Sequence, residues 1–471
     1  MPRIYFDTNV FSNLRSNSNP LYQEFNNLIR QYKNNLNIFF SIAHIRDKKK
    51  DKTDFKFLDF SFMEELVVDN YLGYDPIEKR SSFYLATPQM VFNDETGEEL
   101  DFTNLFKPKA DDDEFTISYK KTITTILSSI KIPYDNTHID KLSDKQKASI
   151  AHIMPNPNSS LMDFANLLMK LTTDMFSDNT TYKDLRSAID EGLNSGLITL
   201  KNKDGDLNQI FENSSLKKTF VNYVKDSMHY TDKNEIPYYN FYLQSYNTLD
   251  MLSVDKDKLT DKNSYSNIFN DGLHSYFARY CDYLISDDKS FKAKTQALYK
   301  TYGVNTEILS TEDFIKILPA IGSNTEIDIN HFWAKLEYDL QHGGLQEPTI
   351  LEDGTNLTRV EKHHLYFNFF DMMFVIKNST YNEIALCKSE SNSLSEPSFR
   401  EEGMILNKII NLFGNDIDSF GYFNLETHRG EERNSDFIRK WDLGKLQLNL
   451  SNHKIIDKFS LTIVFPNRNS E

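Results

Sequence analysis

The chain has few cysteines, no long apolar run and no excess of basic residues. Its two cysteines, Cys281 and Cys387, are far apart and form no CxxC pair, so neither a disulfide framework nor a thiolate zinc site is indicated. No segment approaches the apolar length of a membrane span, and a strand-like stretch with Asp7 stands where a signal peptide would be. We therefore expect a cytoplasmic protein that does not enter a membrane.

The charge balance is acidic, with a formal net charge of −16. Binding to a nucleic-acid backbone depends on Lys and Arg, so this balance argues against a protein that uses its whole surface for that purpose and leaves local basic patches as the alternative. The middle of the chain has no Gly-rich phosphate-binding loop. With 471 residues, of which 39% are hydrophobic, the chain exceeds one core, and we expect two or three folded domains.

The apolar patterns predict an α/β domain that is split by an insertion. Residues 1–57 alternate strand and helix, as in "RIYF" followed by "PLYQEFNNLIRQYKNN" and "NIFFS", which is typical of a parallel sheet. Residues 58–262 show helical periodicity and are predicted to be a helical insertion. The strand and helix alternation returns over residues 263–320, and residues 321–471 are predicted to form an α+β C-terminal domain.

Four acids lie where a parallel sheet would bring them together. Asp7 ends the first predicted strand, Asp47 follows the second, Asp271 opens a predicted helix and Asp288 follows the strand "DYLIS". The carboxyl ends of parallel strands share one edge of the sheet, which is where open α/β sheets bind ligands. Converging carboxylates repel unless cations neutralise them, and oxygen ligands suit Mg²⁺ or Mn²⁺. These ions can activate water against a phosphodiester.

The stretches "YFDTNVFSNL", "FFSIAHIRD" and "DGLHSYFARYCDYLISDDKSF" together resemble the successive motifs of PIN-domain ribonucleases. The resemblance covers residues 1 to about 57 and 262 to about 318, and it implies a PIN-like parallel-sheet nuclease domain. It also implies which residues form the metal and catalytic site and which support it. The implied acids are Asp7, Asp47, Asp271 and Asp288, and the supporting residues are Asn9, Ser286 and the neighbouring Asp287.

The chain departs from the family pattern at several positions. The second acid is Asp47 where Glu is usual, and its shorter side chain favours a water-mediated role. Ser286 stands where Thr is commoner, Asp287 is an additional acid, and the insertion before Asp271 is large. Each acid alone also has a simpler explanation, as a helix cap or a solvated helix residue. The ordered set of four favours the metal site.

Two histidines are spaced three residues from an acid on a predicted helix. His44 precedes Asp47, and His274 follows Asp271, so each His is expected beside its acid on one helix face. We favour a role in supporting the carboxylates over direct metal ligation, because hard cations prefer oxygen ligands. The alternative is a partly buried His with a hydrogen-bonding role.

Basic residues flank the acids and are candidates for contact with the substrate phosphates. They could hold a nucleic-acid backbone without reading its sequence, although such runs are usually solvated helix faces. The candidates are Arg46, Lys48 and Lys49 in "RDKKKDK", and Lys289 and Lys292, with Lys294, after Asp288.

The resemblance implies a metal-dependent endoribonuclease that hydrolyses RNA, such as tRNA or mRNA, and leaves 5′-phosphate and 3′-hydroxyl ends. By analogy with small toxins of the family, we expect a bacterial toxin or an antiviral defence effector. The expected partners are RNA and either a protein regulator or a second copy of the chain. A structure-specific DNA nuclease and a catalytically silent interaction module remain alternatives, because the motifs do not separate RNA from DNA.

Overall fold

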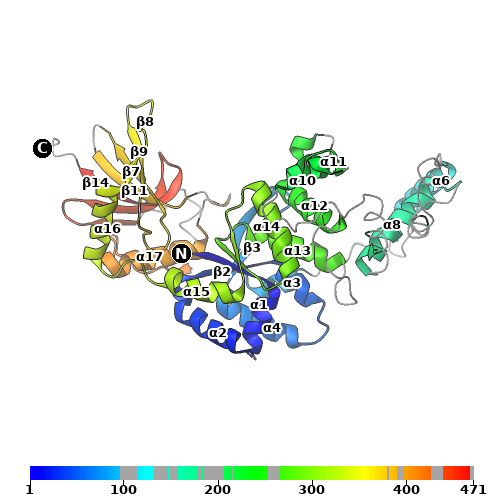
Figure 1. Cartoon of the computed structure of the whole chain (residues 1–471), viewed down its shortest axis with the longest axis horizontal. Coiled ribbons are helices and arrows are strands. Elements are labelled where there is room, and N and C mark those ends of the chain that lie inside the picture. Colours follow the sequence, from blue (N-terminus) through cyan, green and yellow to red (C-terminus); the bar gives the residue numbers. More distant parts are fainter. Residues whose placement is uncertain are drawn as a thin grey trace.

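A computed structural model describes most of the chain. The described residues are 1–95, 114–131, 158–177, 206–252, 265–389 and 397–466, with 147, 182, 183, 186 and 394, and without 18, 215, 229, 231, 379–380 and 426–438. Two sheets organise these residues (Figure 1). The expected mixed α/β class, with a sheet of mainly parallel strands, is confirmed.

The first sheet contains six strands in the order β4-β3-β2-β1-β5-β6. Its neighbouring strands are parallel, except that β3 and β4 are antiparallel. The central strand is β1, in which Tyr5 pairs with Phe39 on one side and with Leu284 on the other. The bounds are β1 Arg3–Phe6, β2 Asn37–Ser41, β3 Asn70–Asp75, β4 Arg80–Leu85, β5 Tyr283–Ile285 and β6 Glu307–Leu309.

Helices cover both faces of this sheet because its strands are apolar on both sides. Ile4 and Phe6 belong to one core cluster, and Tyr5 belongs to the other, as expected from the alternation of side chains along a strand. The helices of this unit are α1 Thr8–Ser16, α2 Pro20–Tyr32, α3 Ile42–Lys49, α4 Phe55–Val67, α5 Pro88–Asp94, α13 Tyr265–Ala278, α14 Lys289–Tyr302 and α15 Thr311–Gly322, with the short 3₁₀ helix η1 Lys33–Asn35.

The range predicted as a helical insertion, residues 58–262, also contains part of the sheet. Strands β3 and β4 form a hairpin there, with Asp75 paired to Arg80. This hairpin follows helix α4, and the turn that joins its strands begins with Pro76, directly after Asp75. The described helices beyond α5 are α6 Glu114–Ser129, α8 Leu161–Ser177, α10 Leu207–Asn213, α11 Phe220–Ser227, η5 Lys233–Glu235 and α12 Tyr238–Met251.

The second sheet is antiparallel, in the order β12-β13-β14-β11-β10-β9-β7, with β8 paired to β9. Helices α16 and α17 supply residues to its core. The bounds are α16 Ile329–His342, β7 Gly344–Leu345, β8 Thr349–Ile350, β9 Asn356–Glu361, β10 Met372–Lys377, β11 Tyr381–Cys387, α17 Phe399–Phe413, β12 Arg439–Asp442, β13 Gln447–His453 and β14 Lys458–Pro466.

Helix α17 joins the two sheet units. Glu401 of α17 forms a buried ion pair with Arg3 of β1, at 2.7 Å, and Arg400 binds Asp69 through two hydrogen bonds of 2.8 Å. The N-terminus accordingly lies between the first sheet and α17 (Figure 1). Among the helices in the described ranges, none has the length and apolar character needed to cross a membrane.

Candidate functional site

A polar pocket of about 340 Å³ lies at the carboxyl ends of β1, β2 and β5. The four acids singled out in the sequence, Asp7, Asp47, Asp271 and Asp288, all line it. Their positions in the chain span more than half of its length, and the parallel pairing of β1 with β2 and β5 brings three of them to one edge. The fourth, Asp271, reaches the pocket from α13.

Asp7 is fixed at the point where β1 turns into α1. It is the N-cap of α1 and accepts a hydrogen bond from the backbone N–H of Asn9 at 3.4 Å. Ser286 Oγ donates to Asp7 Oδ2 at 2.8 Å, so the structure brings Asn9 and Ser286 to this carboxylate. Burial raises the pKa of Asp7 and the charge of Asp47 raises it further, against the opposing effects of His274 and Ser286. A bound cation would favour the ionised form.

Asp288 and Asp271 reach the pocket from different helical positions. Asp288 is exposed, and it caps α14 by accepting a hydrogen bond from the Phe291 N–H at 2.9 Å. Asp271 was expected to open a helix, but α13 already begins at Tyr265, so Asp271 lies in the helix interior. The sequence before Asp271 is rich in Asn and Ser, residues that are weak helix formers, which is why the helix start was placed too late.

Asp287 faces a different part of the molecule from Asp288. Its carboxylate accepts hydrogen bonds from Tyr22 Oη at 2.7 Å, from the Thr311 backbone N–H at 2.9 Å and from Thr311 Oγ1 at 2.8 Å. Burial opposes ionisation, but these hydrogen bonds prevail and lower the pKa of Asp287. Asp287 therefore ties the β5–α14 turn to α2 and α15.

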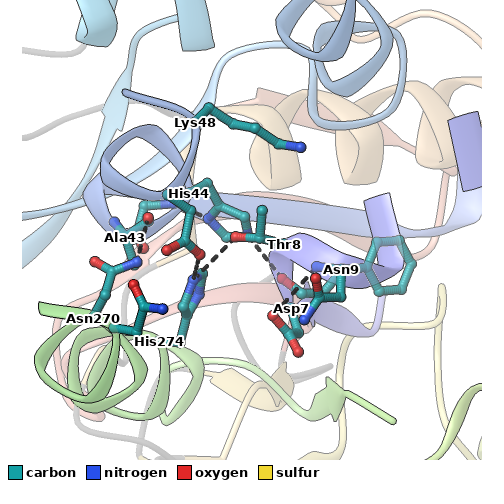
Figure 2. A network of polar contacts seen from close by, with 12 residues as sticks. Asp7, Thr8, Asn9, Ala43, His44, Lys48, Asn270 and His274 are labelled. Atoms are coloured by element: carbon teal, nitrogen blue, oxygen red, sulfur yellow. Dashed lines mark hydrogen bonds and ion pairs between the residues drawn. The ribbon is translucent and has the colours of Figure 1, made fainter. Parts of the chain in front are cut away.

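His274 contacts Asp47, on a neighbouring helix. Its Nε2 lies 3.1 Å from Asp47 Oδ2 and 3.1 Å from Thr8 Oγ1, and Figure 2 shows the ring reaching from α13 toward Thr8. A carboxylate only accepts hydrogen bonds, so Nε2 carries a hydrogen. Burial opposes ionisation of Asp47, but His274, Lys50 and Thr8 together prevail and lower the pKa of Asp47 to about 2. The sequence spacing had paired His274 with Asp271.

His44 is buried and belongs to the framework beneath the pocket. The backbone N–H of Ser41 donates to its Nδ1 at 3.1 Å, so Nε2 carries the hydrogen and donates to the carbonyl of Phe6 at 2.7 Å. Burial and the neighbouring His274 lower the pKa of His44 to about 3. A neutral His44 thus holds the start of α3 to the end of β1. Both of its ring nitrogens bind backbone groups, so His44 does not support Asp47 as the sequence spacing had predicted.

Tyr5 is an unpredicted residue of the site, and its hydroxyl lies between the rings of His44 and His274. Its hydroxyl lies 2.9 Å from His274 Nδ1 and 2.6 Å from Ser41 Oγ. The hydroxyl of Tyr5 thus connects the His274 ring to the end of β2. In the sequence, Tyr5 sits in an apolar strand and is indistinguishable from a core aromatic residue.

Other pocket residues were also missed. Thr8, Ser12, Lys50 and Asn267 line the pocket, and Lys50 Nζ contacts Asn267 Oδ1. Thr8 stands in the quoted "DTN" stretch, so the motif itself carried a signal for it. Ser12 follows Thr8 by one helical turn, and that spacing was available too. Asn267 is the third residue of α13, and nothing in the sequence distinguishes it.

The predicted basic residues divide into two groups. Lys48 lines the pocket, where it is bound to Ser12 Oγ at 2.8 Å and to Asp59 at 2.7 Å. Arg46 pairs with Glu95 at 3.0 Å, and Lys49 donates to the Glu95 carbonyl at 2.8 Å. These two side chains are therefore engaged with the end of α5.

The lysines after Asp288 differ in exposure. Lys289 is exposed and Lys292 is half-buried, and neither is among the pocket-lining residues. Lys294 is fully buried and pairs with Asp250 of α12 at 3.1 Å, so it is a structural cation and not a phosphate contact. Helical periodicity explains the difference, because Lys294 lies on the face of α14 that packs against α12.

The pocket offers the oxygen donors that a hard divalent cation prefers. In the part of the chain that the structure describes, no three His, Cys, Asp or Glu side chains are close enough to form a preassembled metal cluster. The acids share a pocket, where hydrogen bonds hold Asp7 to Ser286, Asp47 to His274 and Asp288 to the Phe291 N–H. In donor chemistry and charge, the residues fit Mg²⁺ or Mn²⁺.

No protein-family model matches this chain, and comparison with the curated proteins and with the solved structures found no match.

Proposed function

We propose that the carboxylate pocket is the active site of a PIN-like, metal-dependent endoribonuclease. The observation that carries this proposal is that Asp7, Asp47, Asp271 and Asp288 line one polar pocket at the carboxyl edge of a parallel sheet. The resemblance of the sequence motifs named the same four residues. Two of these acids are also helix caps at that edge, but Asp47 and Asp271 are not caps, and a cation site accounts for all four in one pocket.

The roles of the acids follow from how each one is held. Asp7, Asp271 and Asp288 would hold one or two Mg²⁺ or Mn²⁺ ions, which supply an activated water and neutralise the charge on the leaving oxygen. Ser286 orients Asp7 by donating to Oδ2. One oxygen of Asp47 is occupied by His274, so Asp47 is suited to complete the site or to position the attacking water with its other oxygen.

The substrate would enter past two cations at the rim. Lys48 and Lys50 line the pocket beside the acids and can contact phosphates without reading base sequence. Lys50 lies 3.8 Å from Asp47 and is partly exposed. Lys289, exposed at the start of α14, extends the same edge. This local group supplies positive charge on a chain whose net charge is −16.

The test is a cleavage assay on labelled tRNA, mRNA, single-stranded DNA and duplex DNA, with Mg²⁺, Mn²⁺ or EDTA. We expect RNA to be cut in the presence of metal, and Asp7→Asn, Asp271→Asn and Asp288→Asn each to lower the rate by about a hundredfold or more, as expected when a metal-binding carboxylate is lost. Asp353→Asn, on an exposed loop of the C-terminal unit, is the matched control and should leave the rate unchanged.

Binding of Mn²⁺ to the wild-type protein and to Asp7→Asn, measured by calorimetry, gives a second readout that needs no substrate. RNA cleavage that persists in EDTA and in Asp7→Asn would disprove the metal mechanism. Cutting of DNA alone would replace RNA by DNA as the substrate. Tight RNA binding without any cleavage would favour an interaction module.

A further inference from the structure

A second cavity, of about 500 Å³, lies between the first sheet unit and helix α17. Its lining includes Asn37 and Asn70, the first residues of β2 and β3. The carboxylate pocket is at the other end of the parallel strands, and the two cavities share no lining residue. The volume falls within the range of small-ligand sites in proteins, which is about 300–1,000 Å³.

The charged side chains of this junction cavity are mainly cationic. Lys33, Arg400 and Lys408 line it together with a single acid, Glu65. Glu65 is paired with Arg30 at 3.2 Å, and Arg400 is held by Asp69. With these two pairs set aside, Lys33 and Lys408 leave the cavity positively charged, so it favours an anionic ligand.

Lys408 is the cation of this cavity with the weakest hydrogen-bond acceptors around it. Its Nζ has only long contacts, of 3.5 Å to the Phe367 carbonyl and 3.4 Å to Asn368 Oδ1. Among the described residues, no carboxylate lies within 4 Å of it. Burial lowers the pKa of Lys408 to about 8. A half-buried ammonium with weak acceptors gains from an anion placed in the cavity.

Carboxamides supply donors and acceptors around the cations. Asn407 and Asn411 use their Oδ1 atoms to accept from the Phe423 N–H and from Tyr422 Oη, both at 2.8 Å, so each keeps an Nδ2 group for a ligand. Asn35 donates its Nδ2 to the Gly322 carbonyl at 2.7 Å and keeps its Oδ1 as an acceptor. This mixture suits a ligand with both kinds of group.

Apolar side chains complete the wall, among them Leu36, Leu66 and Met404. A ligand that matches all three features has an anionic group for Lys408, a hydrogen-bonding edge for the carboxamides and a flat ring for the apolar wall. We propose that the junction cavity binds a nucleoside monophosphate. Because its lining comes from both sheet units, the bound nucleotide would bridge them. This proposal is independent of the nuclease activity.

The test is calorimetric titration of the full chain in EDTA, so that no metal-dependent binding at the carboxylate pocket contributes. The probes are AMP, GMP, CMP, UMP, the parent nucleosides and inorganic phosphate. We expect at least one monophosphate to bind. Its affinity should exceed that of its nucleoside and that of inorganic phosphate by about tenfold or more, because a hydrogen bond to a charged group contributes at least that much to binding.

Two variants locate the site. Lys408→Met should weaken the binding of the monophosphate by about tenfold or more. Asn407→Asp should weaken binding to a similar extent, because it places a negative charge in the cavity. This variant keeps the acceptor for the Phe423 N–H, so we expect it to fold. It therefore tests the proposal even if Lys408→Met is unstable. Lys445→Met, at an exposed position of the C-terminal unit, and Asp7→Asn should bind as the wild type does.

The proposal is wrong if no monophosphate binds the wild-type chain, or if Asn407→Asp and Lys408→Met bind as tightly as the wild type. Equal affinity for inorganic phosphate and for the best monophosphate would reduce the site to a phosphate site and overturn the nucleotide assignment. Loss of binding in Asp7→Asn would move the ligand to the other pocket.

Discussion

The neighbouring residues Asp287 and Asp288 have different structural tasks. Asp287 accepts three hydrogen bonds from Tyr22 and Thr311, whereas Asp288 caps α14 and lines the carboxylate pocket. The motif resemblance assigned the site role to Asp288, but the local pattern of two acids after one strand did not indicate what Asp287 binds. The turn geometry after β5 makes the distinction, since it points successive side chains in different directions.

We expect a substitution of Asp287 to affect mainly the stability of the fold, and a substitution of Asp288 to affect mainly RNA cleavage. Asp287→Ala should lower the free energy of unfolding by about 1–3 kcal/mol, because it removes the acceptor for three donors. Asp288→Asn should keep near-native stability, because Asn is as good a helix cap as Asp, and it should lose RNA cleavage. Urea denaturation and initial cleavage rates measure the two quantities. Equal effects of the two variants on both quantities would contradict the division of roles.

At the scale of elements, helices α3 and α13 are joined across the pocket by Asp47 and His274, at 3.1 Å. The same ring lies 2.9 Å from Tyr5 of β1 and 3.1 Å from Thr8 of α1. One imidazole thus connects four elements, and Figure 2 shows how closely they converge.

His274→Ala is therefore expected to destabilise the protein. The change removes partners from Tyr5, Thr8 and Asp47 in a largely buried region, and we expect the free energy of unfolding to fall by about 1–3 kcal/mol. His342→Ala, at an exposed position near the end of α16, is the control and should change it by less than about 0.5 kcal/mol. Urea denaturation of both variants is the measurement. Similar values for the two would show that the contacts of His274 contribute little.

Strands with a strong apolar pattern in the sequence could be predicted, and strands without one could not. The apolar runs that form β1, β2 and β5 mark the strands and the acids at their ends. The hairpin β3–β4 was missed, because its Tyr-rich strands lie between two helical patterns and carry few aliphatic residues. The partner of His274 could not be predicted from helix spacing either, since it depends on the packing of α13 against α3.

At the scale of the whole molecule, the ion pair of Arg3 and Glu401 ties the first sheet to α17. Both side chains are almost completely buried. Burial opposes ionisation of Glu401, but Arg3 and Lys388 prevail and lower its pKa to about 2. A carboxyl with a lowered pKa in the folded state stabilises the fold above its unfolded pKa, and the contribution is lost as the pH falls toward the folded value.

Glu401→Gln should therefore change the acid sensitivity of folding. We expect the variant to be less stable than the wild type at pH 6, because Arg3 loses its charged partner. The difference should narrow by about 1.4 kcal/mol between pH 6 and pH 3.5, since the wild-type chain loses the contribution of Glu401 over that range. Urea denaturation at a series of pH values measures the difference, and a gap that stays constant with pH would contradict the assignment.

The central position of β1 also bears on the synthesis of the chain. Asp7 is made well before β5, the strand with which β1 pairs, and its carboxylate accepts a hydrogen bond from Ser286 and lines the same pocket as Asp288. Roughly 280 residues separate the two acids, which takes the ribosome about 15 s to 1 min at about 5–20 residues per second. A chain that stalls or is cut before β5 carries Asp7 and Asp47 without their partners. A chain that ends before β5 therefore lacks part of the carboxylate pocket.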